Sequence, residues 1–221
     1  MAAQPPVDCL RVLGVDPGSL RTGWGVIDRR RQSLEFRAGG VIVPKDHLSL
    51  PERLQIIYVN LIGTIQYWTP QALSLEKAFV AHNVQSAFRL GEVRGVVLLA
   101  AAQTGLRVTE HNPTEIKTAV TGYGRADKQQ VQKAVYALLG SKAMPGVAPQ
   151  DLGLPMSQDA TDALAAAICH LNSSQLAELL REEKEKTHGA GRTDPDRARL
   201  LRSAFAKRPL PRSLRMVIKD D

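Results

Sequence analysis

The chain has 221 residues, of which 43% are hydrophobic and 23% are charged. These proportions are typical of a folded globular protein and exclude a wholly disordered or fibrous one. Its 29 Lys and Arg residues outnumber its 22 Asp and Glu residues, and the formal net charge of +7 favours nucleic acid as the partner.

The composition also limits where the protein works. The longest apolar or small run, residues 95–102, is much shorter than the roughly 20 residues that cross a bilayer. The first residues lack the basic and apolar pattern of a signal peptide, and Cys9 and Cys169 have no paired spacing. We therefore expect a cytoplasmic protein that has no membrane span, no disulfide framework and no cysteine-based zinc site.

The hydrophobic patterns predict strands and helices in alternation. Branched apolar runs predict an antiparallel meander of strands over 10–16, 24–28 and 33–43. A helix over 50–68, a strand over 72–76, a helix over 82–103 and a strand over 106–110 come next. Short helices over 113–120 and 128–139, a connector over 141–155 and a helix from about residue 157 complete the series. This order predicts an α/β fold in which a mixed sheet is flanked by helices.

The composition changes after residue 172. A charged helix is predicted over 174–186, and residues 188–219 hold nine Lys or Arg and two Asp among several Gly and Pro. We interpret residues 1–172 as the folded domain and residues 173–221 as a basic, mobile tail without a core of its own.

Four carboxylates stand where they could act together. Asp16 and Glu76 each end a predicted strand, and Asp159 and Asp162 share one face near the start of the last helix. Each has an ordinary alternative, because Asp-Pro-Gly forms turns and acids favour the first turn of a helix. If all four converge, their repulsion requires a cation, and oxygen ligands favour Mg²⁺ or Mn²⁺. Two such ions can activate water against a phosphodiester, so the pattern predicts a nuclease.

Four ordered blocks then carry a family resemblance. Residues 13–27 (LGVDPGSLRTGWGVI), 75–96, 113–131 and 158–170 (QDATDALAAAICH) are similar to the RuvC family of Holliday junction resolvases. The resemblance covers residues 10–172 and implies a ribonuclease H-like fold with a five-stranded sheet. It further implies a homodimer that makes paired nicks in four-way DNA junctions during recombination and repair, with a branch-migration motor as a partner.

The same resemblance assigns roles to single residues. It implies that Asp16, Glu76, Asp159 and Asp162 are the catalytic acids and hold two Mg²⁺ ions, with Mn²⁺ as an alternative. The resemblance also includes relatives that carry histidine in place of Asp159. Residues 1–172 are then the nuclease domain.

Five further residues are implied to face DNA. Lys117 and Lys128 would lie near scissile or neighbouring phosphates, with Lys117 also acting in catalysis. Phe79 would stack on a base at the junction centre, and Asn83 and Arg89 would add contacts. The ordinary alternatives are solvated lysines and an aromatic residue of the core.

Other interpretations stay open at this point. The helix that contains Gly91 and Gly95 resembles the dimer helix of the family, or packs only on its own sheet. Lys77 either lowers the pKa of Glu76 or points to the opposite face of the strand. An actin-like or sugar-kinase-like ATPase is an alternative because VDPGSLRTG resembles a phosphate loop, although a second such loop is missing. A non-catalytic ribonuclease H-like module that binds nucleic acid is another.

Overall fold

The computed structural model describes residue 5 and residues 8–77, 84–140 and 157–188. Its centre is a five-stranded sheet in the order β3-β2-β1-β4-β5. The strands are β1 (Cys9–Asp16), β2 (Thr22–Arg30), β3 (Ser33–Ile42), β4 (Ala72–Glu76) and β5 (Arg107–His111). The first three strands pair antiparallel, whereas β4 runs parallel to both β1 and β5. The predicted meander and mixed sheet are confirmed.

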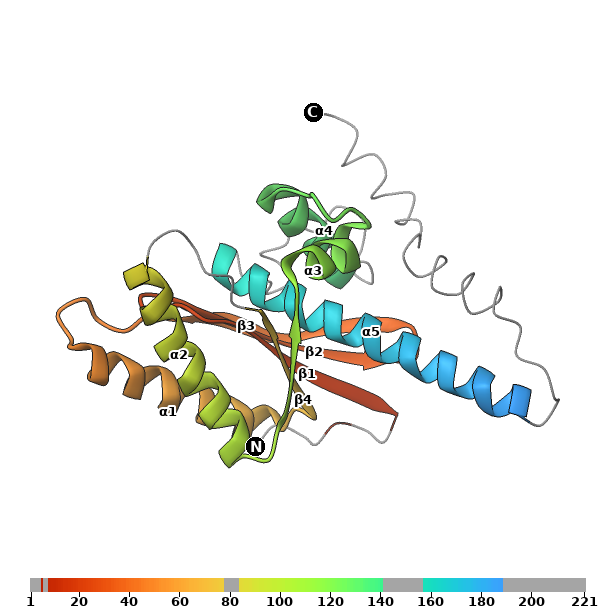
Figure 1. Ribbon diagram of the computed structural model, residues 1–221, viewed down its shortest axis with the longest axis horizontal. Coiled ribbons are helices and arrows are strands. Elements are labelled where there is room, and N and C mark those ends of the chain that lie inside the picture. The colour runs from red at the N-terminus through yellow and green to blue at the C-terminus, as the bar shows by residue number, and fades with distance from the viewer. Residues whose placement is uncertain (1–4, 6–7, 78–83, 141–156, 189–221) are drawn as a thin grey trace.

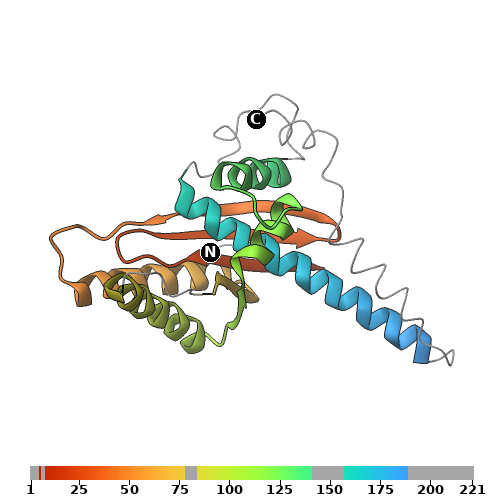
Figure 2. The same cartoon turned by 45° about the horizontal axis from the view of Figure 1, so that its top comes forward.

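Helices cover both faces of the sheet (Figure 1). On one face lie α1 (Leu50–Trp68) and α2 (Val84–Gln103), and on the other lie α3 (Pro113–Thr121), α4 (Lys128–Gly140) and α5 (Gln158–His188). Figure 2 shows the same three layers from a tilted view. None of the helices in the described part of the chain has the length and apolar character needed to span a membrane.

Each face has its own hydrophobic core because neighbouring residues of β1 point to opposite sides. Leu13 and Val15 pack with buried residues of α1 and α2, such as Ile57 and Val93. Val12 packs with buried residues of α3, α4 and α5. The β1 run reads as almost continuously apolar for this reason: it is buried on both faces.

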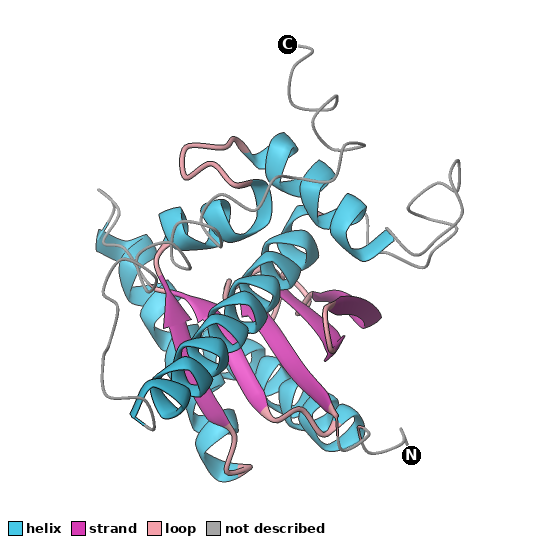
Figure 3. Cartoon of the chain, turned by 90° about the vertical axis from the view of Figure 1, so that its right-hand side faces the viewer, coloured by secondary structure: helices cyan, strands magenta, loops and turns pink. Residues whose placement is uncertain are grey.

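Glycines let α5 lie directly on the sheet. A Cβ atom at Gly14 would stand 1.9 Å from the carbonyl oxygen of Ala163, and one at Gly23 would stand 1.9 Å from that of Asp159. Neither position has room for a side chain, and the helix offers mainly alanines along this stretch. Figure 3 shows α5 crossing the strands at this close approach, which brings the first turns of α5 to the end of β1.

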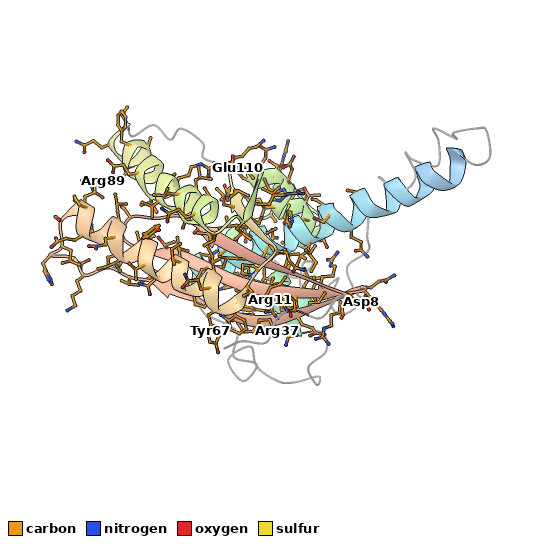
Figure 4. All side chains as sticks on the ribbon, turned by 90° about the horizontal axis from the view of Figure 1, so that it is seen from below. Asp8, Arg11, Arg37, Tyr67, Arg89 and Glu110 are labelled. Atoms are coloured by element: carbon orange, nitrogen blue, oxygen red, sulfur yellow. The ribbon has the colours of Figure 1, made fainter. Side chains whose placement is uncertain are left out.

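A buried ion-pair network stabilises the other end of the sheet. The carboxylate of Asp28 accepts hydrogen bonds from Nε of Arg11 at 2.6 Å and from Nε of Arg37 at 2.7 Å. Arg11 also donates to the main-chain carbonyl of Trp68 at 2.7 Å, which ties the end of α1 to β1. Figure 4 labels Arg11 and Arg37 on this side of the molecule. This charge is buried but fully paired, so the network fixes the arrangement of these strands.

The last helix is longer than predicted. α5 continues without a break to His188, through the predicted boundary at residue 172 and the predicted separate helix over 174–186. Arg29 of β2 anchors this continuation, because its guanidinium donates to the carbonyl of Leu171 and to the side chains of Asn172 and Gln175. The connector over 141–155 and the basic segment from residue 189 lie outside the described residues, so the two-part domain division stays a prediction.

Candidate active site

Two acidic residues end neighbouring parallel strands. Asp16 is the last residue of β1 and Glu76 is the last residue of β4. The pairing of these strands runs up to Val15 and Leu75, directly before the two acids. Since parallel strands end at the same edge of a sheet, both side chains reach that edge, which is where ligands bind in sheets of this kind.

A pocket of about 470 Å³ opens at this edge. Asp16 and Glu76 line it from the strands, and Asp162 lines it from the second turn of α5. Lys117 of α3 and Lys128 at the start of α4 are among the basic residues that line it. The remaining lining residues are Pro17, Lys77, Leu90, Arg94, Pro113, Ile116, Val131 and Ala165.

The crowding of acids changes their ionisation. The pKa of Asp16 is raised from 3.8 to about 7, chiefly by burial and then by the charges of Asp162, Glu76 and Asp159, while Lys128 opposes the rise. Beyond the effect of burial, the three neighbouring carboxylates create an excess of negative charge around Asp16. A divalent cation would remove that excess, so the electrostatics favour cation binding here.

The other two pocket acids follow the same rule. Burial raises the pKa of Glu76, and the charge of Asp162 adds to this, whereas Lys117 and Lys128 lower it. Burial also raises the pKa of Asp162, although its carboxylate accepts a hydrogen bond of 2.8 Å from the side chain of Gln158. The two lysines therefore act on the acids across the pocket.

The turn between α3, which carries Lys117, and α4 determines where Lys128 begins its helix. α3 ends at Thr121, and its C-cap Gly122 adopts a left-handed conformation with φ 77° that suits glycine. At the start of α4, the carboxylate of Asp127 accepts the N–H of Gln130 at 2.8 Å, and the Gln130 side chain accepts the N–H of Asp127 at 3.0 Å. This reciprocal cap starts α4 so that Lys128 occupies its first turn.

Asp159 lies beside the pocket and is not one of its lining residues. Its carboxylate accepts a hydrogen bond of 2.6 Å from Nε of Arg21, in the loop between β1 and β2. Its charge still raises the pKa of Asp16 and of Asp162. The structure thus brings three of the four predicted acids into one pocket and places the fourth at its margin, paired with an arginine.

The predicted DNA-facing residues have different outcomes. Phe79 and Asn83 lie outside the described residues. Arg89 is exposed on α2, as Figure 4 shows, but it is not among the residues that line the pocket. Lys77 lines the pocket. Among the described residues, however, its positive charge lowers the pKa of Glu115 and of His111, the last residue of β5.

The sequence did not predict that three further residues would contact the acids: Arg21, Arg94 and Gln158. Arg94 follows the buried Val93 on α2, so a charged residue beside the apolar stripe of this helix was a usable signal. Gln158 stands four residues before Asp162, which is the spacing at which helical side chains meet. Arg21 offered no local signal, because its partner Asp159 is 138 residues away in the chain.

The donor set of the pocket fits a hard divalent cation. Carboxylate oxygens are the preferred protein ligands of Mg²⁺, which binds through one or two of them together with waters and phosphate. In the described part of the chain, no three Asp, Glu, His or Cys side chains stand close enough to hold one ion as they are. Two of the acids are engaged in hydrogen bonds, Asp159 with Arg21 and Asp162 with Gln158.

Comparisons with known proteins agree with this geometry. Residues 12–170 match the family described as "Crossover junction endodeoxyribonuclease RuvC". The chain is 41% identical over 172 residues to the protein of that name from Geobacter sulfurreducens, with 78% of this chain and 98% of the relative covered. It is 43% identical to that from Magnetococcus marinus over 169 residues, covering 75% and 86%. A solved structure, T. thermophilus RuvC in complex with Holliday junction substrate, aligns with a TM-score of 0.67 at 27% identity, covering 76% of this chain and 96% of that one.

Proposed function

The chain belongs to the RuvC family of crossover junction endodeoxyribonucleases, and from this premise we propose that the pocket of Asp16, Glu76 and Asp162 is its catalytic centre. The enzyme resolves Holliday junctions by cutting phosphodiester bonds, the activity for which its relatives are named. It thereby acts in recombination and repair. One observation supports the assignment of the site: three carboxylates from β1, β4 and α5 line one pocket that Lys117 and Lys128 also line. The family relation decides against the ATPase alternative.

Nucleases of this family depend on divalent metal ions. We propose that the ion here is Mg²⁺, with Mn²⁺ as a substitute and two ions per site, held by Asp16, Glu76 and Asp162. Asp159 would join them once its carboxylate leaves Arg21. When bound, such ions make a water nucleophilic at neutral pH and stabilise the leaving oxygen of a phosphodiester.

The lysines would act on the DNA strand itself. Lys117 and Lys128 lie across the pocket from the acids and lower the pKa of Glu76, so their positive charges reach its interior. A phosphate that enters the pocket would meet both ammonium groups. We propose that Lys117 stabilises the negative charge that develops during cleavage and that Lys128 orients the neighbouring phosphate. Phe79, Asn83 and Arg89 remain proposed contacts to the junction.

The substrate is two-fold symmetric, which favours a symmetric enzyme. We propose a homodimer whose contact includes α2. Three large apolar residues of this helix are exposed, Val84, Phe88 and Leu99, and a Cβ atom at Gly91 or Gly95 would meet no atom within 4 Å. A second copy of the chain would cover this surface and place two pockets on two strands of one junction. A branch-migration motor as a further partner, and a cytoplasmic location, remain proposals of the same kind.

The decisive experiment is a cleavage assay. Purified protein is incubated with a labelled synthetic four-way junction or a matched linear duplex, with EDTA, Mg²⁺ or Mn²⁺. We expect metal-dependent paired nicks in the junction and little cutting of the duplex. Asp16→Asn and Glu76→Gln should abolish cutting while junction binding persists, and Asp46→Asn, at a side chain that is 99% exposed, should leave both unchanged.

Two results would contradict the proposal. Mg²⁺-dependent nicking by Asp16→Asn at the wild-type rate would remove the pocket from catalysis. Junction binding by the wild-type protein without cutting in either metal would favour the non-catalytic module.

A further inference from the structure

Arg94 of α2 reaches from the wall of the pocket to the last residue of β4. Its Nη1 donates a hydrogen bond of 2.9 Å to the main-chain carbonyl of Glu76, and its Nη2 pairs with the carboxylate of Glu110 on β5. The Arg94 side chain is only 14% exposed, and Figure 4 labels Glu110. One guanidinium therefore joins α2, β4 and β5 where Glu76 leaves the sheet.

The main chain at Glu76 has a neighbour on one side only within the sheet. On the β5 side, Glu76 pairs with His111, and the N–H of Lys77 donates to the His111 carbonyl at 2.8 Å. On the β1 side, the pairing ends one residue earlier, at Leu75. In a trans peptide the carbonyl points opposite to the following N–H. The Glu76 carbonyl thus points away from β5, and Arg94 provides its donor.

The charge of Arg94 has its own counter-ion. Glu110 pairs with the guanidinium, whereas the cationic groups that lower the pKa of Glu76 are Lys117 and Lys128. The two lysines supply positive charge to the acid, and Arg94 contacts its peptide. The guanidinium is suited to this task because it is planar and presents donors in two directions, which a lysine ammonium on a single stem does not reproduce.

We propose that Arg94 is a positioning residue for Glu76, fixing the last peptide of β4 so that the carboxylate stays in the pocket beside Asp16 and Asp162. This inference rests on the proposed function, in which Glu76 holds metal. Residues that orient metal ligands in this indirect way commonly change metal affinity or activity by about 10–100-fold when they are replaced.

The test replaces Arg94 by lysine, which keeps the charge but cannot bridge both partners. We expect Arg94→Lys to weaken Mn²⁺ binding, measured by titration calorimetry, by about 10-fold or more and to slow single-turnover junction cleavage by a similar factor. Junction affinity in EDTA should stay within about twofold of wild type, because the substitution retains the charge. The pH midpoint of cleavage should not move. Arg107→Lys, at an exposed arginine of β5, is the matched control and should change none of these.

A second variant and a cycle make the result specific. Glu110→Gln releases the other end of the guanidinium and should weaken Mn²⁺ binding in the same direction, which also covers the case in which Arg94→Lys does not fold. In a Glu76→Gln background, Arg94→Lys should cause no further loss of Mn²⁺ affinity, because both changes act through one ligand.

Three outcomes would overturn the inference. They are unchanged Mn²⁺ affinity in both Arg94→Lys and Glu110→Gln, an undiminished effect of Arg94→Lys in the Glu76→Gln background, and a loss of junction affinity that accounts for the whole loss of cleavage. If instead the wild-type protein binds Mn²⁺ but does not cut junctions, the proposed function fails, while the Mn²⁺ measurements still test Arg94.

Discussion

The acid pocket should lower the stability of the metal-free protein, and Asp16→Asn should restore it. The pKa of Asp16 rises from 3.8 to about 7 in the folded state, because burial and the neighbouring acids disfavour its charge. Each pKa unit corresponds to about 1.4 kcal/mol, so ionised Asp16 costs at most about 4 kcal/mol of folding free energy. An asparagine of the same shape carries no charge and avoids this cost.

The sign of the effect depends on pH. Below about pH 4, Asp16 is protonated in both the folded and the unfolded state, so the carboxylate has no cost. Between about pH 4 and pH 7, the unfolded chain releases the proton first, and the stability of the wild-type protein falls as pH rises. Above about pH 7 the cost is complete. The advantage of Asp16→Asn should therefore grow from pH 5 to pH 8.

Urea denaturation in EDTA at several pH values, followed by circular dichroism, measures this difference. Added Mg²⁺ should stabilise the wild-type protein more than Asp16→Asn, because a ligand that binds only the folded state stabilises it. The exposed Asp46→Asn serves as the control for removal of one negative charge. An advantage of Asp16→Asn that is absent at pH 8, or equal at pH 5 and pH 8, would refute the reasoning.

Four further predictions follow from the fold and the site. Gly14→Ala should destabilise the protein by about 3 kcal/mol or more, measured in urea, because its Cβ would collide with the backbone of α5. Asp28→Asn should cost about 3–5 kcal/mol at pH 7. Burial raises the pKa of Asp28, but the bonds to two arginines outweigh it and lower the pKa, so this loss should shrink as acid protonates the wild-type carboxylate. Lys117→Ala should slow cleavage more than it weakens junction binding, and it should move the pH midpoint of cleavage upward, because Lys117 lowers the pKa of Glu76. Removal of residues 189–221 should reduce the salt dependence of junction binding, since the basic segment would release counterions on DNA; an unchanged slope would exclude it from the interface.

The sequence predicted most of the fold because its signals were local. The helix α1 and the strand β4 begin and end where the apolar spacing and Pro51 and Pro70 indicated. The buried run of β1 likewise ended at Asp16 as expected. Each of these elements carries its pattern within about 20 residues, so no knowledge of tertiary contacts was needed.

The site was only partly predictable, because it depends on contacts between distant parts of the chain. Strand ends identified Asp16 and Glu76 as candidates, and helical spacing put Asp159 and Asp162 on one face. The pairing of Asp159 with Arg21 joins residues that are 138 positions apart, so it required the folded structure. The contact between Arg94 and the Glu76 carbonyl involves the main chain, so no pairing of residue types in the sequence could indicate it.

The close seat of α5 on β1 has a consequence for protein synthesis. Asp162, which completes the acid pocket from α5, is synthesised 146 residues after Asp16. At translation rates of about 5–20 residues per second, the synthesis of these 146 residues takes roughly 7 to 29 seconds, during which the carboxylate set is incomplete. Under the proposed function, nuclease activity therefore depends on the packing of α5 over the sheet, which supplies Asp162 to the pocket.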